Sequence, residues 1–178
     1  MADKEREARL REAMYSRYGV RRDEDLPAAL LRSLPDKRLS AQLFERRIKA
    51  IRIVSVERRN AIEVALPRTE RVAWVASLES VPEIDGFLIN ILNGRPLEEM
   101  THSVGHELGH TFFTDIFHPN LLRIANAPCR PPISFEEWAC DTFSRLWNNR
   151  LSEADRFALR TILQYLAGHP RRMYVIEP

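Results

Sequence analysis

Along the first 50 residues, apolar side chains recur at the three-to-four-residue spacing that is typical of helices. Residues 3–18 form a highly charged segment with a thin apolar seam, and a short second helix is expected over residues 26–31. Ser40 is expected to cap a third helix that continues to about Ala50. The pattern therefore predicts a helical N-terminal region over residues 1–50.

The pattern then changes to an alternation of apolar and polar residues, which is typical of half-buried strands. Strands are expected over residues 51–56, 61–66, 72–78 and 87–92, with turns at residues 58–60 and 67–70. Together they predict a small mixed or antiparallel sheet over residues 51–94.

Helical spacing returns after Pro96, a residue that suits the first turn of a helix. This helix is expected to stop before Pro119, and a second helix is expected over residues 133–149. One face of the second helix is expected to enter the core through five apolar residues, Phe135, Trp138, Ala139, Phe143 and Leu146.

Ser152 is expected to cap a last helix over residues 153–167, and the closing stretch 169–178 carries no readable pattern. By its length of 178 residues, the chain is expected to form one α+β domain over 1–178. In that domain the sheet packs against the helices of residues 95–149, and a C-terminal helix and tail occupy residues 150–178.

The helix after Pro96 contains His106, Glu107 and His110 in the spacing H-E-x-x-H. Positions i and i+4 lie on one face of a helix, so the two histidines can offer a nitrogen each to one metal ion. The carboxylate of Glu107 lies beside the first ligand and can act as a general base. Two ligands, a base and an open coordination position form the pattern of zinc peptidases, so Zn²⁺ is the expected cofactor.

Two histidines hold zinc weakly, so a third protein ligand is expected. A further histidine six residues after His110 would be one solution, but Ile116 occupies that position. A glutamate from the next helix is the other common solution, and Glu136 and Glu137 are the candidates.

On the helical wheel, Glu137 lies one turn before Asp141 on the same side of the second helix. We therefore expect Glu137 to bind the metal and Asp141 to accept a hydrogen bond from the far nitrogen of a ligand histidine. Two alternatives remain open. Ser134 and Glu137 also form a capping box, which would make Glu137 a helix cap, and Glu136 is the reserve ligand.

Residues 84–147 resemble the ImmA/IrrE family of bacterial zinc peptidases, in which a strand, a short loop and a helix with A-H-E-L-G-H follow one another. The family's later helix reads E-x-x-A-N/D-x-F-A, and Glu137, Asp141 and Phe143 match it. Three departures replace alanines of the family with other small residues, namely Gly105, Cys140 and Ser144. The family's Leu-Leu-Met-Pro is also missing after this helix.

The resemblance implies a zincin-like fold and a zinc-dependent endopeptidase, with His106, His110 and Glu137 as metal ligands and Glu107 as the base. It also implies a protein substrate, often a helix-turn-helix repressor of a mobile element or stress regulon, or a partner of the toxin–antitoxin type. Residues 87–92 are expected to form the sheet edge along which an extended substrate pairs.

A second group that stabilises the reacting carbonyl oxygen is not identifiable from the residues. His118, Tyr165 and Tyr174 are candidates, and each has a structural reading as well. His102 lies one turn before His106, where it lines the cleft or has a solvated or capping role near the helix start.

Charge modifies this picture in the first 60 residues, which hold 16 lysines and arginines against 10 acidic residues. Such a region can meet nucleic acid, but its acids are interleaved with its bases, which favours a solvated helical surface. Two rival functions stay open. One is a non-proteolytic, zinc-stabilised binding module, and the other is a DNA-associated zinc protease of the SprT kind, whose third ligand would be another histidine.

No apolar run in the sequence approaches the ~20 residues that cross a bilayer, and the first residues carry no apolar signal segment. The two cysteines, Cys129 and Cys140, form neither a disulfide framework nor a Cys-x-x-Cys motif. A cytoplasmic protein without membrane partners is therefore expected.

Overall fold

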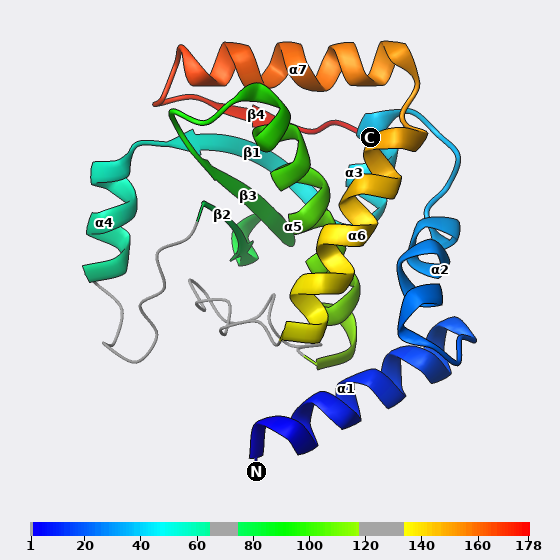
Figure 1. Cartoon of the computed structure of the whole chain (residues 1–178). Coiled ribbons are helices and arrows are strands. Elements are labelled where there is room, and N and C mark those ends of the chain that lie inside the picture. The colour runs from blue at the N-terminus through cyan, green and yellow to red at the C-terminus, as the bar shows by residue number, and fades with distance from the viewer. Residues whose placement is uncertain (1, 65–74, 118–133) are drawn as a thin grey trace.

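The computed structural model describes residues 2–64, 75–117 and 134–178, and it shows an α+β chain that is mostly helical (Figure 1). Its helices are α1 (Ala2–Tyr18), α2 (Leu26–Ser33), α3 (Leu39–Glu45), α4 (Val56–Val64), α5 (Leu97–Phe117), α6 (Ser134–Arg150) and α7 (Glu153–Ala167). Short 3-10 turns, η1 (Asp23–Asp25) and η3 (Pro82–Ile84), precede α2 and β3. The predicted first, second and last helices are confirmed, and so are the two long helices that carry the motif residues.

The described residues form a small mixed sheet of four strands in the order β2 (Ala76–Val81), β3 (Gly86–Leu92), β1 (Ile48–Val54) and β4 (Met173–Val175). β1 and β3 are parallel, with Ile51 opposite Ile89 and Ile53 opposite Ile91. β2 pairs with β3, and β4 with β1, in antiparallel fashion. The predicted small mixed sheet is confirmed, although one of its expected strands is absent and β4 was not expected.

β3 lies inside the sheet and is buried along its whole length. The expectation that residues 87–92 form a sheet edge is therefore wrong. The physical reason is visible in the sequence: β3 is an uninterrupted apolar run apart from Asn90, which is typical of a strand that has neighbours on both sides. The strand expected over residues 72–78 begins later, at Ala76, and the turn at 67–70 lies outside the described residues.

The strand expected over residues 61–66 is wrong, because residues 56–64 form α4, which also absorbs the expected turn at 58–60. Ser55 explains the difference. Its hydroxyl accepts a hydrogen bond from the backbone N–H of Arg58 (3.2 Å), and its carbonyl accepts one from Arg59 (3.0 Å). Ser55 thus caps the first turn of a helix, and this local cap prevails over the alternating apolar pattern.

The third helix is shorter than expected and Ser40 is not its cap. α3 begins at Leu39, whose backbone N–H donates to the carboxylate of Asp155 on α7 (3.2 Å), so the cap comes from a distant helix. The helix ends early because Arg47 adopts a left-handed backbone conformation with φ of 62°. Ile48, expected on this helix, instead starts β1 and is fully buried.

One continuous apolar core joins the sheet to α5, α6 and α7. α5 and α6 pack side by side, and α7 lies over β1 and β4 (Figure 1). On α6 the predicted core face is right for Phe135, Ala139 and Phe143, but Trp138 is 39% exposed. The buried residue near the end of α6 is Trp147, whose indole N–H donates to Gln42 on α3 (2.9 Å).

Candidate metal centre

The motif residues lie between α5 and α6, two helices that approach each other closely. A Cβ atom on Gly105 would stand 2.4 Å from the Ser144 hydroxyl, and one on Gly109 would stand 3.1 Å from the Cys140 sulfur. Small residues on α5 therefore let the polar face of α6 reach the histidines. The Ser144 hydroxyl also donates to the backbone carbonyl of His102 (2.6 Å), which fixes the two helices relative to each other.

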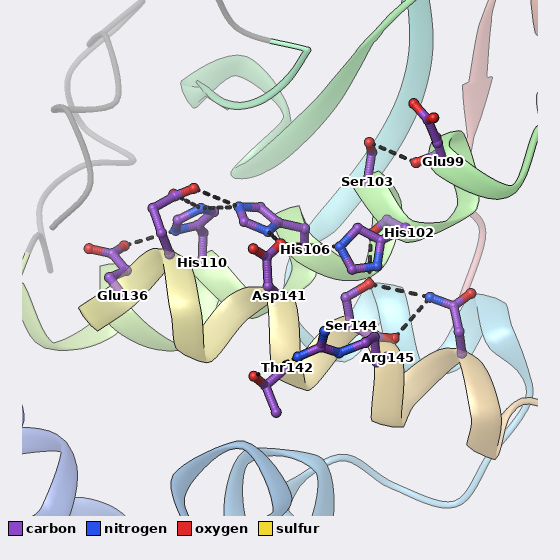
Figure 2. A network of polar contacts seen from close by, with 12 residues as sticks. Glu99, His102, Ser103, His106, His110, Glu136, Asp141, Thr142, Ser144 and Arg145 are labelled. Carbon is purple, nitrogen blue, oxygen red and sulfur yellow. Dashed lines mark hydrogen bonds and ion pairs between the residues drawn. The ribbon is translucent and has the colours of Figure 1, made fainter. Parts of the chain in front are cut away.

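The imidazoles of His106 and His110 face each other at this junction, as the i, i+4 spacing predicts (Figure 2). Their Nε2 atoms are 2.9 Å apart, and the ring centroids are 4.7 Å apart in an edge-to-face arrangement. Both side chains are only 14% exposed.

Each imidazole is held from behind by a carboxylate of α6. Nδ1 of His106 lies 2.8 Å from Oδ1 of Asp141, and Nδ1 of His110 lies 2.9 Å from Oε1 of Glu136 (Figure 2). An ionised carboxylate only accepts hydrogen bonds, so each Nδ1 carries a hydrogen, and in a neutral imidazole Nε2 then presents a lone pair. Two lone pairs that face each other at 2.9 Å are unfavourable unless a proton or a metal ion lies between them.

Glu137 completes this arrangement from α6. Its carboxylate oxygens lie 3.1 Å from Nε2 of His110 and 3.5 Å from Nε2 of His106. The ligand atoms of a tetrahedral zinc site are about 3.3 Å apart, given zinc–ligand bonds of about 2.0–2.1 Å. The spacing of the two nitrogens and the carboxylate therefore fits a divalent metal ion.

Electrostatics in the centre favour an ionised Glu137 and raise the pKa values of both histidines. Burial raises the pKa of Glu137, but the contacts with His106 and His110 outweigh burial and lower that pKa to about 2. Burial lowers the pKa of His106, yet the neighbouring carboxylates of Glu137 and Glu107 make the net shift upward. The pKa of His110 is likewise raised, against burial, by Cys140, Glu136 and Glu137. These carboxylates thus stabilise positive charge at the two nitrogens, which a metal ion also supplies.

Glu107 is buried, with 5% of its surface exposed. Burial raises the pKa of its carboxyl group, and the nearby His110 and His106 lower it, with a net upward shift. It can also join His106 and His110 in a group whose possible ligand atoms all lie within 4.8 Å of one another. A buried carboxyl group with a raised pKa, next to two histidines that could hold a metal ion, suits proton transfer.

A second group that could hold a metal ion consists of His102, His106 and Asp141. His102 is partly exposed, and its Nε2 lies 3.1 Å from the same Asp141 oxygen that contacts His106. His102 is partly solvated, as expected, but its side chain also contacts Asp141 and so joins the polar network of the centre (Figure 2).

The structure brings together the predicted site residues His106, Glu107, His110, Glu137 and Asp141. Glu136, the alternative ligand, is 6% exposed, and its contact with Nδ1 of His110 was not predicted from the sequence. The sequence did carry a signal for this contact. Glu136 is adjacent to Glu137 on α6, and His110 lies one turn after His106 on the facing helix α5.

Of the other candidates, Tyr165 stacks on His169, with ring centroids 4.3 Å apart, and Tyr174 lies on β4. His118, Cys129 and Pro119 lie outside the described residues. Cys140 is buried, and its burial raises the pKa of its thiol to about 12.

No known protein-family model, curated protein or solved structure matches this chain. The resemblance to the ImmA/IrrE family therefore rests on the motif residues. Among the described residues, no helix is both long enough and apolar enough to span a membrane.

Proposed function

We propose that this protein is a zinc-dependent endopeptidase with a zincin-like site, in which His106, His110 and Glu137 bind the metal. The observation that carries the proposal is that three possible metal ligands, two imidazole nitrogens and one carboxylate, converge on one point. The two Nε2 atoms face each other at 2.9 Å, and the Glu137 carboxylate lies within 3.5 Å of both. Imidazole and carboxylate ligands in this number are typical of catalytic rather than structural zinc sites.

Zinc bound there would polarise a peptide carbonyl and lower the pKa of a water molecule towards ~7. Glu107 has the role of general base, because its carboxylate takes the proton of the attacking water and passes it to the leaving amine. The raised pKa of Glu107 helps the first transfer, since it makes the carboxylate a stronger base towards the water. Asp141 and Glu136 hold the imidazoles in the tautomer that binds metal.

For the substrate, the resemblance to the ImmA/IrrE family favours a protein, such as a helix-turn-helix repressor or a toxin–antitoxin-type partner. Cleavage of such a repressor would place the protein in gene regulation or a stress response. The motif residues support this proposal.

A DNA-associated protease of the SprT kind fits less well, because the group that faces both Nε2 atoms is Glu137 and not a histidine. Several basic side chains in the first 60 residues are paired with acids, which favours a structural use of the charge. Examples are Arg11 with Asp23 (2.9 Å) and Arg52 with Glu79 (3.0 Å).

The test compares Glu107→Gln with the wild type and with Glu98→Gln, which replaces an exposed glutamate of the same helix. Zinc content is measured by elemental analysis, and cleavage by mass spectrometry of new N-termini in a proteome-derived peptide library. Glu107→Gln is expected to retain zinc and lose cleavage by about 10²–10⁴-fold, because only proton transfer is removed. Cleavage that survives in this variant at the wild-type rate contradicts the mechanism. A zinc-loaded wild type that cleaves nothing while binding a protein partner supports the binding module instead.

A further inference from the structure

His102 is a histidine of α5 that the proposed catalytic centre does not use. Its Nε2 lies 3.1 Å from Oδ1 of Asp141, and the same oxygen lies 2.8 Å from Nδ1 of His106. The side chains of His102 and Asp141 are 38% and 52% exposed, whereas that of His106 is 14% exposed. An imidazole and a carboxylate thus stand together on the solvent side of the centre.

The geometry points to a second, weaker binding site for a divalent transition metal ion, formed by Nε2 of His102 and the carboxylate of Asp141. His102, His106 and Asp141 can each offer one atom, and these atoms lie within 4.8 Å of one another. Imidazole and carboxylate suit zinc and its neighbours among the first-row metals. Because both side chains are half exposed, water fills the remaining coordination positions. Two protein ligands make this site weaker than the three-ligand centre beside it.

The backbone on both sides of the second site is fixed. Ser144 donates its hydroxyl hydrogen to the carbonyl of His102 (2.6 Å), and Asn148 donates to the Ser144 carbonyl (2.9 Å). Gly105 allows this contact, since it leaves room for the Ser144 side chain. An ion therefore meets two ligands that the packed helices already hold close together, and binding needs no rearrangement of the backbone.

The surrounding charge also favours a second cation. Four carboxyl groups, those of Glu107, Glu136, Glu137 and Asp141, lie close to the histidines of α5. One divalent ion at the first site compensates only two negative charges. A second ion at Asp141 enters a region where negative charge remains, which raises its local concentration.

The two sites compete for Asp141, and this part of the inference rests on the proposed function. An ion at His102 draws the Asp141 carboxylate away from His106, and loss of such a partner typically weakens metal binding by about 10–100-fold. By thermodynamic reciprocity, an ion in the first site weakens the second site by the same factor. Excess zinc is thus expected to lower the affinity of the catalytic centre for its own ion.

The test counts bound ions. Metal-stripped protein is dialysed against a series of free Zn²⁺ concentrations, and bound zinc per chain is measured by elemental analysis. The wild type is expected to bind one ion tightly and a second one weakly. His102→Ala is expected to keep the tight ion and lose the weak one, and His102→Gln is expected to behave likewise. His169→Ala, which removes an exposed imidazole at the end of α7, serves as the control and is expected to bind both ions.

Two further variants separate the second site from the proposed function. His110→Ala is expected to lose the tight ion and keep the weak one, and Asp141→Asn is expected to lose the weak ion and to hold the tight one about 10–100-fold less firmly. A wild type that saturates at one ion, or a second ion that persists in His102→Ala, overturns the second site. If His110→Ala retains the tight ion, the proposed set of ligands in the catalytic centre is wrong. The comparison of His102→Ala with the wild type still decides whether the second site exists.

Discussion

Replacing Gly105 with alanine is expected to destabilise the protein, although alanine is the better helix former. The new Cβ would stand 2.4 Å from the Ser144 hydroxyl and 2.8 Å from Cε3 of Trp147, and both of these side chains are fully buried. Helix propensity favours alanine by about 1 kcal/mol. Overpacking typically costs about 1–3 kcal/mol, and displacing Ser144 sacrifices a hydrogen bond worth about 1 kcal/mol. The net expectation is a loss of about 1–3 kcal/mol in the free energy of unfolding.

The assay is urea unfolding in the presence of a chelator, so that metal affinity does not enter the result. Gly168→Ala is the matched control, because the Cβ there would meet nothing closer than the Tyr165 carbonyl at 3.6 Å. A double variant with alanine at both 105 and 144 removes the closest contact. Its loss of stability is expected to be smaller than the sum of the two single losses by about 1 kcal/mol or more.

The two single variants and the double variant form a double-mutant cycle. The cycle tests whether two departures from the ImmA/IrrE pattern compensate each other. The family has alanine at both positions, and this chain has Gly105 opposite Ser144. A Gly105→Ala variant as stable as the wild type, or single effects that add within about 0.5 kcal/mol, would refute the compensation.

Three further predictions concern the centre and the N-terminal helix. Glu137→Ala is expected to lose the rise in melting temperature that zinc gives the wild type. In the presence of a chelator, its free energy of unfolding is expected to fall below that of the wild type only by a capping effect of about 0.5–2 kcal/mol. A zinc-dependent melting shift like that of the wild type contradicts the ligand role. Glu136→Ala is expected to weaken zinc binding by about 10–100-fold, because Glu136 holds Nδ1 of His110, and a competition titration with a chelating dye measures the change; unchanged affinity would mean that this contact does not orient the ligand. Burial and the hydrogen bond to Asp23 raise the pKa of Tyr15 to about 12, so the neutral phenol stabilises the folded protein below pH 10 and that stabilisation disappears as the pH rises towards 12. Tyr15→Phe is expected to unfold with a weaker pH dependence in that window, and chemical denaturation at several pH values tests the difference.

The motif helix and its partner were predictable from the sequence because their signals are local and strong. The i, i+4 spacing put both imidazoles on one face, and the helical wheel of α6 put Glu137 and Asp141 towards them. The wheel alone did not distinguish Trp138 from Trp147 as the core residue, since that depends on where α1, α2 and α3 pack. Gln42, the partner of the Trp147 indole, lies more than a hundred residues away along the chain.

The sheet was harder to predict because its pairing depends on distant partners. Residues 61–66 alternate like a strand, yet Ser55 caps a helix that covers residues 61–64. The apolar run 87–92 was assigned to a strand correctly, but its position inside the sheet follows from pairing with β1 and β2. Similarly, Asp155 caps α3 from another helix, and such a tertiary cap leaves no signal near residue 39.

The short strand β4 has a consequence for folding and aggregation. It covers one side of β1, with Arg52 opposite Met173, and the Ile176 N–H adds a hydrogen bond to the Lys49 carbonyl (2.8 Å). This contact joins segments about 120 residues apart, and long-range strand pairing of this kind is slow to form. Until it forms, β1 presents an apolar edge that can pair with another chain. Once in place, β4 itself is only three residues long, and so short an edge is a poor template for further strands.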